Sequence, residues 1–426
     1  MKNLVFSILF LIIGLTLFLV PVNVLAQNQA LDQQNLENKV TIKFWEADEA
    51  KIDEEILDPL IKKFEENNPQ ITVERTHAGT VEDLRQNTQT AFMGGQGPDL
   101  VLSPFDHIGP FSIMGIAQPL DNLASNELKN KFIKSALPGM SLNGNLYGIP
   151  LTMGNHLMLM YNKKMVKNAP TTWSELIKIA QAQTIDRNGD GLNDQYGLAY
   201  NLNEPFWWVA FQGGLGGWVF DSNYQPTLNT KATVAALQFV HDLKYKYKIV
   251  PKESDDQLAD SLFKEGNVAF IINGDWALDS YRNNENIELG VAPIPKFEAT
   301  NKFGQPMTSG KGFIMLTDLN QEKQIAVLKF IDFMTNIAAQ ELFVNNNFLP
   351  SNSAAYQLPQ IQNDPIMLGS AQQLRNGRAM PVIPEMRGIW DAIRPALQSV
   401  MSNDLSPKAA AKQMQQAAEE NIKGMR

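Results

Sequence analysis

Residues 40–74 read VTIKFWEADEAKIDEEILDPLIKKFEENNPQITVE, and this stretch decides the fold class. Apolar and polar residues alternate over 40–44, which predicts a half-buried strand. Apolar residues then share one face of a predicted helix, which Pro59 either starts, with Asp58 as its N-cap, or kinks. Residues 71–74 are predicted to form the next strand. A strand, a helix and a second strand in succession predict an α/β layer architecture with a sheet rich in parallel strands.

The same alternation continues along the rest of the chain. Further strands are predicted at 99–103, 157–161 and 268–272, and further helices at 173–183, 233–247, 321–336 and from Pro407, with Ser406 as the N-cap of the last. The chain has 426 residues, which is more than a single hydrophobic core usually organises. We therefore expect an α/β protein of two lobes.

The N-terminus carries a targeting pattern. Lys2 precedes an apolar run over residues 4–20, Pro21 breaks the run, and Val24-Leu25-Ala26 fits a cleavage site. This order predicts a secretory signal peptide over residues 1–26, followed by a flexible polar lead-in over 27–39. The alternative is an uncleaved membrane anchor, because the apolar run approaches the length of a span. We expect a soluble protein exported to the periplasm or the extracellular space.

Composition and charge exclude several classes of function. The chain has no cysteine, so it forms no disulfide, no thiolate zinc site and no lipid-modified cysteine, and we expect it not to be a lipoprotein. Its net charge is −9, and no run of Lys and Arg could follow a phosphate backbone, so we expect no nucleic-acid partner.

No catalytic signature is complete in the sequence. The four histidines are far apart, and neither an HExxH nor a GxSxG motif is present. Residues 309–312 read SGKG, which resembles part of a phosphate-binding loop but lacks its Ser or Thr. A pair of carboxylates for glycoside hydrolysis is defined by geometry and stays open at this point.

Five segments combine aromatic and polar side chains beside predicted turns, namely residues 44–48, 103–107, 203–208, 273–276 and 387–390. A sugar ring has apolar C–H faces and hydroxyls around its edge, so a sugar site needs flat aromatic platforms and polar side chains together. Any one of these aromatic residues could instead fill the core. The recurrence of the combination in five segments favours a sugar site.

One loop matches part of a calcium-binding pattern. The oxygen ligands and the glycine of residues 186–194 (DRNGDGLND) follow the spacing of an EF-hand loop, although Gly197 stands where a bidentate Glu is expected. The candidate ligands of a structural calcium ion are Asp186, Asn188, Asp190, Leu192 and Asp194. The alternative is a solvated turn in which the Asp and Asn side chains bond to their own backbone.

These segments resemble the family 1 extracellular solute-binding proteins, of the maltose- and maltodextrin-binding type, over nearly the whole chain that follows the signal peptide. The resemblance rests on the motifs LIKKFEENN (60–68), GPDL (97–100), YGIP (147–150), YNK (161–163), TWSEL (172–176), NLNEP (201–205), FKEG (263–266), INGDW (272–276) and MPVIP (380–384), with Trp390 after them.

The resemblance implies a type II periplasmic binding fold, in which hinge strands join two lobes and the ligand binds in the cleft between them. It implies that the chain crosses between the lobes more than once. We expect lobe 1 to comprise residues 40–153 and 306–350, and lobe 2 to comprise residues 154–305 and 351–426.

The resemblance also implies which residues touch the sugar. The expected ligand-binding residues are Trp45, Glu46, Asp48, Asp106, Asn155, Glu204, Trp207, Trp276 and Trp390, to which the charge of Arg387 adds a further candidate. Asn155 falls near an acidic contact of the maltodextrin binders, His107 replaces an Arg and Ser103 replaces a Trp. The expected ligand is therefore a di- or oligosaccharide such as maltose, trehalose or sucrose.

We expect the sugar to favour a closed form of the hinge, which then docks onto the membrane permease of an ABC importer. The binding protein itself would be a monomer without enzymatic activity, and it would require no cofactor. One alternative is a secreted carbohydrate-active enzyme that uses Asp106 and Glu204 as acid and base. A second alternative is a sugar sensor that passes its signal to a receptor.

Overall fold

The computed structural model describes residues 38–48 and 52–425, and it contains two principal β-sheets. The predicted signal peptide and all but the end of the lead-in lie outside these described residues. No described helix combines the length and the apolar character that crossing a membrane requires.

The first sheet, with the helices that cover it, forms lobe 1. Its strand order is β14-β6-β13-β3-β1-β2, and β15 pairs with β13. β1 runs parallel to β2 and β3, whereas β13 runs antiparallel to β3 and β6. The strands are β1 (Val40–Glu46), β2 (Ile71–His77), β3 (Leu100–Pro104), β6 (Ile149–Gly154), β13 (Met307–Met315), β14 (Leu349–Pro350) and β15 (Arg378–Ala379).

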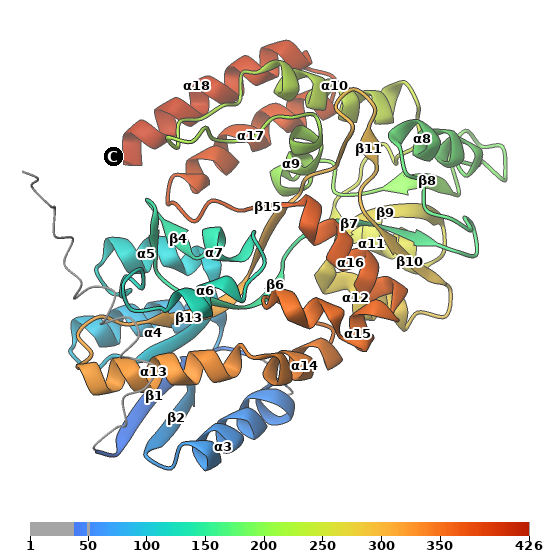
Figure 1. Cartoon of the computed structure of the whole chain (residues 1–426). Coiled ribbons are helices and arrows are strands. Elements are labelled where there is room, and N and C mark those ends of the chain that lie inside the picture. Colours follow the sequence, from blue (N-terminus) through green and yellow to red (C-terminus); the bar gives the residue numbers. More distant parts are fainter. Residues whose placement is uncertain (1–37, 49–51, 426) are drawn as a thin grey trace, which may run out of the picture.

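Helices and short turns cover this sheet (Figure 1). They are the π-helical turn η1 (Asp53–Leu57), η2 (Phe105–His107), η4 (Ser353–Gln357), α3 (Asp58–Asn67), α4 (Val81–Met93), α5 (Ile108–Ile113), α6 (Asn126–Asn130), α7 (Ala136–Gly139), α13 (Gln321–Met334) and α14 (Ile337–Asn345). Phe330 of α13 lies with its ring centroid 5.6 Å from that of Phe44 and 5.1 Å from that of Phe64. These three buried rings join α13, β1 and α3 into one core.

The second sheet is the centre of lobe 2, and its order is β10-β7-β9-β8. Its strands are β7 (Leu157–Asn162), β8 (Tyr196–Ala199), β9 (Val268–Gly274) and β10 (Leu289–Ala292). All residues of β7 and β9 are buried, as expected for strands covered on both faces. The helices of this lobe are α8 (Trp173–Ala182), α9 (Pro205–Gly214), α10 (Lys231–Tyr245), α11 (Asp256–Lys264), η3 (Asp275–Ala277), α12 (Leu278–Arg282), α15 (Pro359–Gln362), α16 (Pro365–Asn376), α17 (Met386–Met401) and α18 (Pro407–Met425).

Two short hairpins complete the described elements. β4 (Ser141–Leu142) pairs with β5 (Asn145–Leu146) in lobe 1, and β11 (Lys296–Phe297) pairs with β12 (Lys302–Phe303) beside the chain that leads to β13. Figure 1 shows α17 and α18 lying together with α9 and α10 at the top of the molecule, far from the blue strands of lobe 1.

The chain crosses between the two sheets at three places. β6 leads directly into β7 through Asn155 and His156, β10 leads to β13, and the segment after β14 leads to α16, which packs on β10. The first residues of β13 pair with β15 at Met307 and Thr308, so β13 extends from the region between the lobes into lobe 1. The expected boundaries of the two lobes stay a prediction, and β15, which lies within the range expected for lobe 2, pairs with β13 of the first sheet.

Most predicted elements are confirmed, and one predicted cap is wrong. Thr172 caps α8 through a capping box with Glu175, and Ser406 accepts a bond from the amide of Ala409 at the start of α18. Asp58, in contrast, caps nothing, because η1 makes the chain helical before it and the N-cap of α3 is Leu57. The Asp58 carboxylate accepts a hydrogen bond from Arg75 at 3.0 Å instead.

Candidate functional site

A cavity of about 370 Å³ lies where the two lobes meet, within the usual range of about 300–1,000 Å³ for small-molecule sites. Its walls come from the end of β6, the middle of β13, the turn after β3 and the turn after β9. Six polar side chains contribute to this lining, and they are Asp106, Thr152, Asn155, Asp275, Ser309 and Lys311.

Lobe 1 contributes Asp106 and Lys311 to this cavity. Asp106 lies in the turn η2 with an exposed side chain, and its carboxylate has no hydrogen bond or ion pair within residues 38–48 and 52–425. Lys311, in the middle of β13, forms an ion pair with Asp48, whose side chain is buried. Asp106 is thus an available acceptor, while Asp48 reaches the cavity through Lys311.

Ser103 and His107, which the resemblance marks as departures from the maltodextrin binders, contact each other. The Ser103 hydroxyl and the His107 Nδ1 atom lie 2.5 Å apart, and both side chains are buried. Burial lowers the pKa of His107, which favours the neutral imidazole. These side chains therefore stabilise the turn that carries Asp106.

The crossover from β6 to β7 is attached to the end of β9. The Asp275 carboxylate accepts hydrogen bonds from the backbone amides of Asn155 at 3.0 Å and of His156 at 3.4 Å. Asn155 adopts a left-handed conformation with φ +48°, which Asn tolerates well. Burial raises the pKa of Asp275 and lowers that of His156, whose ring also contacts Ser370 of α16.

Lobe 2 contributes an aromatic cluster around Trp276, the residue that follows Asp275 in the sequence. Trp276 lies with its ring centroid 6.0 Å from that of Trp207 and 6.3 Å from that of Phe206. Trp207 is buried, and its indole N–H donates to the carbonyl of Ile272 in β9. Trp276 is 49% exposed, so an aromatic platform rests on a fixed, buried neighbour.

Two predicted residues of lobe 2 lie on facing helices, since α17 packs against α9. Glu204, at the N-terminus of α9, forms an ion pair with Arg394 of α17. Trp390 lies one helical turn before Arg394 and is half-buried, whereas Arg387 is exposed. The structure thus joins Glu204 to Arg394, and Arg387 lies near the start of α17.

Trp45 and Glu46 lie apart from the cavity, on opposite faces of β1. Trp45 lines a different hollow with Thr76 and His77. Glu46 is fully buried, and its carboxylate accepts hydrogen bonds from Arg75 at 2.8 Å and from the Asp48 amide at 2.7 Å. Their role in ligand binding stays a prediction.

The expected site residues include neither Lys311 nor Arg394, and Phe206 and Asp275 appear only as members of the segments 203–208 and 273–276. Arg394 could have been found, because it follows Trp390 by four residues and therefore shares its helical face. Lys311 carries no comparable local signal, since its partner Asp48 comes from a distant part of the sequence. Asp275 is marked only by its position next to Trp276, and its bond to the Asn155 amide has no local signal.

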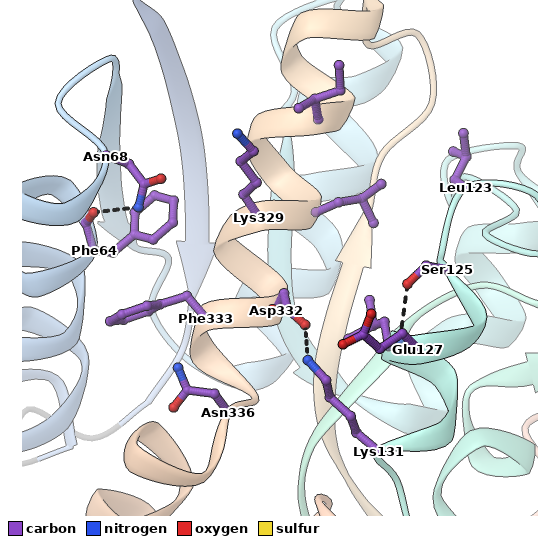
Figure 2. A pocket seen from close by; sticks show the side chains of 13 residues that line it. Phe64, Asn68, Leu123, Ser125, Glu127, Lys131, Lys329, Asp332, Phe333 and Asn336 are labelled. Atoms are coloured by element: carbon purple, nitrogen blue, oxygen red, sulfur yellow. Dashed lines mark hydrogen bonds and ion pairs between the residues drawn. The ribbon is translucent and has the colours of Figure 1, made fainter. Parts of the chain in front are cut away.

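Two larger hollows each lie within a single lobe. A groove of about 430 Å³ lies along α13, and Lys131 forms an ion pair with Asp332 there (Figure 2). A hollow of about 950 Å³ in lobe 2 is lined by Tyr and Lys side chains next to the loop 186–194. Neither lies at the junction of the two sheets, so we take the cavity between the lobes as the candidate site.

The predicted calcium loop is closed by its own hydrogen bonds. Asp186 accepts the amides of Gly189 and Gly191 at 2.7 and 2.9 Å, and Asp190 accepts that of Leu192 at 2.7 Å. The Asn188 amide group donates to Asp190 at 3.0 Å. This arrangement gathers the oxygens predicted as ligands, and calcium binding stays a prediction.

The sequence profile of the family described as bacterial extracellular solute-binding protein matches residues 59–369, which is most of the chain. This chain belongs to that family. The match includes strands of both sheets and all three crossings between them. The fold is accordingly the type II periplasmic binding fold, with two lobes and the cleft between them.

Relatives of this solute-binding protein are named for the sugars that they bind. The maltotriose-binding protein of Pyrococcus abyssi is 27% identical over 80% of this chain and 74% of its own. The maltose/maltodextrin-binding domain from Bdellovibrio bacteriovorus, solved with maltotriose, is 37% identical over 90% of this chain and 100% of its own, with a TM-score of 0.71. A cyclo/maltodextrin-binding protein solved with maltotetraose is 25% identical over 92% of this chain and 100% of its own, with a TM-score of 0.81.

Proposed function

We propose that this protein captures a short malto-oligosaccharide, or a sugar of similar size, in the cavity between its lobes and delivers it to an ABC importer. The relatives named above bind maltotriose, maltotetraose or maltodextrin, which supports this class of ligand. The departures at Ser103, His107 and Asn155 leave disaccharides such as maltose, trehalose and sucrose as further candidates.

One observation carries this proposal. Asp106 of lobe 1 is exposed in the cavity, and the exposed Trp276 of lobe 2 directly follows Asp275, which lines the same cavity. A carboxylate accepts hydrogen bonds from sugar hydroxyls, while an indole packs on the apolar face of the ring. A ligand that uses both groups binds residues of both lobes and therefore favours closure of the hinge.

In this proposal the protein acts after export, as a monomer in the periplasm or outside the cell, with its signal peptide removed. The closed form docks onto the permease subunits, and the protein catalyses no reaction itself. Asp106 and Glu204 then serve as hydrogen-bonding groups. The Glu204 carboxylate is already paired with Arg394, which suits binding better than it suits a general acid.

Thermal unfolding of the exported protein tests this function. A ligand that binds only the folded state raises the midpoint in proportion to ln(1 + [L]/Kd). We expect maltose, maltotriose and maltotetraose, or trehalose or sucrose, to raise the midpoint, while amino acids have no effect. A shift with amino acids and none with any of these sugars would overturn the proposal.

A further inference from the structure

A second group of polar side chains lies outside the cavity, at the ends of β1 and β2. Glu46 and His77 are the last residues of these strands, and they are register partners in the parallel pair. Asp53 belongs to the π-helical turn η1. Ligand atoms of Glu46, Asp53 and His77 all lie within 4.8 Å of one another. The sheet register and the following turn thus bring together a histidine and two carboxylates.

The distances in this group match the coordination shell of a transition-metal ion. His77 Nδ1 lies 3.5 Å from Glu46 Oε2 and 3.7 Å from Asp53 Oδ2. Four ligands at the usual zinc distances of about 2.1 Å form a tetrahedron whose edges are about 3.4 Å long. A divalent ion could therefore enter among these atoms with only a small movement of the exposed His77 ring.

A buried acceptor in this group has no partner. Asp53 is 7% exposed, and its Oδ1 atom makes no hydrogen bond within the described residues. Buried carboxylate oxygens are normally hydrogen-bonded or bound to a metal ion. The unpaired Oδ1 atom is an observation separate from the ligand distances, and it indicates that this group of side chains binds a further partner.

The charge balance favours a cation as that component. Glu46 and Asp53 bring two negative charges into a buried region, and Arg75 supplies one positive charge to both, at 2.8 and 3.0 Å. Arg75 also pairs with Asp58 at 3.0 Å, so one guanidinium is shared by three carboxyl groups. Arg75 contacts Oε1 of Glu46, while Oε2 is the atom next to His77, so the guanidinium and a metal ion would use different oxygens of Glu46.

We propose that Glu46, Asp53 and His77 form a binding site for one divalent transition-metal ion of the Zn²⁺ type. The imidazole nitrogen and two carboxylate oxygens are the ligands, and a water molecule completes the tetrahedron. Such an ion ties the turn after β1 to the end of β2, so it stabilises the edge of lobe 1 beside Asp48. This site is separate from the sugar cavity and from the loop 186–194.

Titration calorimetry with ZnCl₂ tests this site, using the exported protein after its metal has been removed with EDTA. We expect saturable binding of one Zn²⁺ per chain. His77→Gln and Asp53→Asn should each weaken this binding by at least about tenfold. His241→Gln is the matched control, because His241 also lies next to a carboxylate, that of Asp242 at 3.8 Å, and should bind Zn²⁺ as the unmodified protein does.

Because Asp53 is buried, its variant could lose metal by losing its fold, so His77→Gln is the decisive variant. The His77 side chain is 48% exposed, and its replacement should leave the metal-free thermal midpoint unchanged. No saturable Zn²⁺ binding, or equal binding by the His77→Gln variant, would overturn the proposal.

Discussion

The Asp275 carboxylate accepts a hydrogen bond from the Asn155 amide at 3.0 Å, which fastens the residue before Trp276 to a crossover between the lobes. A Cβ atom on Gly154 would lie only 2.4 Å from the same carboxylate, so glycine is required there for this close approach. We infer that the aromatic platform and the hinge are positioned together, and that changes in Asp275 act on both.

Replacing Asp275 by Ala should therefore weaken sugar binding without removing any group of the platform. Two backbone amides lose their acceptor, and the restraint on Trp276 is lost with them. We expect calorimetry to give a severalfold higher Kd for Asp275→Ala than for the unmodified protein. Asp275→Asn keeps one acceptor oxygen, so its Kd should lie between these two values. Equal affinities for all three proteins would show that this link does not position the platform.

Removing the exposed indole should weaken sugar binding directly. Trp276→Ala loses the apolar surface on which a sugar ring packs, and we expect the Kd to rise about tenfold or more. Trp276→Phe keeps an aromatic face and should recover most of the affinity. Calorimetry measures both values, and an unchanged Kd in the Ala variant would place the sugar elsewhere.

Removing the charge of Asp106 should affect binding but not folding. A hydrogen bond to a charged group contributes about 1.5–3 kcal/mol, so Asp106→Asn should raise the Kd about tenfold or more. Its side chain is exposed, so the thermal midpoint without sugar should not change. Glu127→Gln, in the groove along α13, is the control and should bind sugar normally.

Acidification should destabilise the protein between about pH 7 and pH 5. Burial lowers the pKa values of His107 and His156, so the unfolded chain takes up protons that the folded chain excludes. Their contribution to stability is complete above the unfolded pKa of about 6.5 and is lost as the pH falls toward the folded pKa.

Asp275 acts in the opposite direction, because burial raises its pKa. Its ionised form is disfavoured in the folded chain, and this cost decreases as the pH falls through the raised pKa. Burial raises the pKa of Asp53 and Asp256 as well, and these groups act in the same direction as Asp275. The two histidines lose stability from their unfolded pKa of about 6.5, whereas each carboxyl group gains stability only once the pH reaches its raised pKa, so we expect the thermal midpoint to fall on acidification. His107→Asn should flatten this pH dependence, and a midpoint that rises from pH 7 to pH 5 would contradict the assignment.

Calcium binding by the loop 186–194 is tested by the effect of Ca²⁺ on thermal unfolding. If the side-chain oxygens bind the ion, Ca²⁺ should raise the midpoint, and Asp190→Asn should remove the effect. Asp221 accepts backbone amides in a similar turn, so Asp221→Asn should respond to Ca²⁺ as the unmodified protein does. A midpoint that is insensitive to Ca²⁺ would leave the loop as a hydrogen-bonded turn.

Local sequence patterns were sufficient for much of the fold. The capping box of Thr172 and Glu175 lies within four residues, and the strand pattern of β1 repeats every second residue. The same alternation places Glu46 on the strand face of the buried Val40, Ile42 and Phe44. Had it been followed to the end of the strand, this pattern would have indicated that Glu46 is buried.

The charged pairs of the candidate site could not be derived in this way. Lys311 and Asp48 are 263 residues apart, Arg394 and Glu204 are 190 apart, and Asp275 and Asn155 are 120 apart. Each pair depends on how the chain crosses between the lobes, and the sequence alone does not give that arrangement. The resemblance to a known family supplied the lobes but none of these three partners.

The central claim is that one sugar molecule contacts both lobes, and a double-mutant cycle in calorimetry tests it most directly. Maltotriose, or the best ligand of the thermal screen, is titrated into the unmodified protein, Asp106→Asn, Trp276→Ala and the double variant. We expect one sugar per chain and a loss of affinity in both single variants, one from each lobe. Loss of affinity in the variant of one lobe only, with the other unchanged, would contradict capture between the lobes.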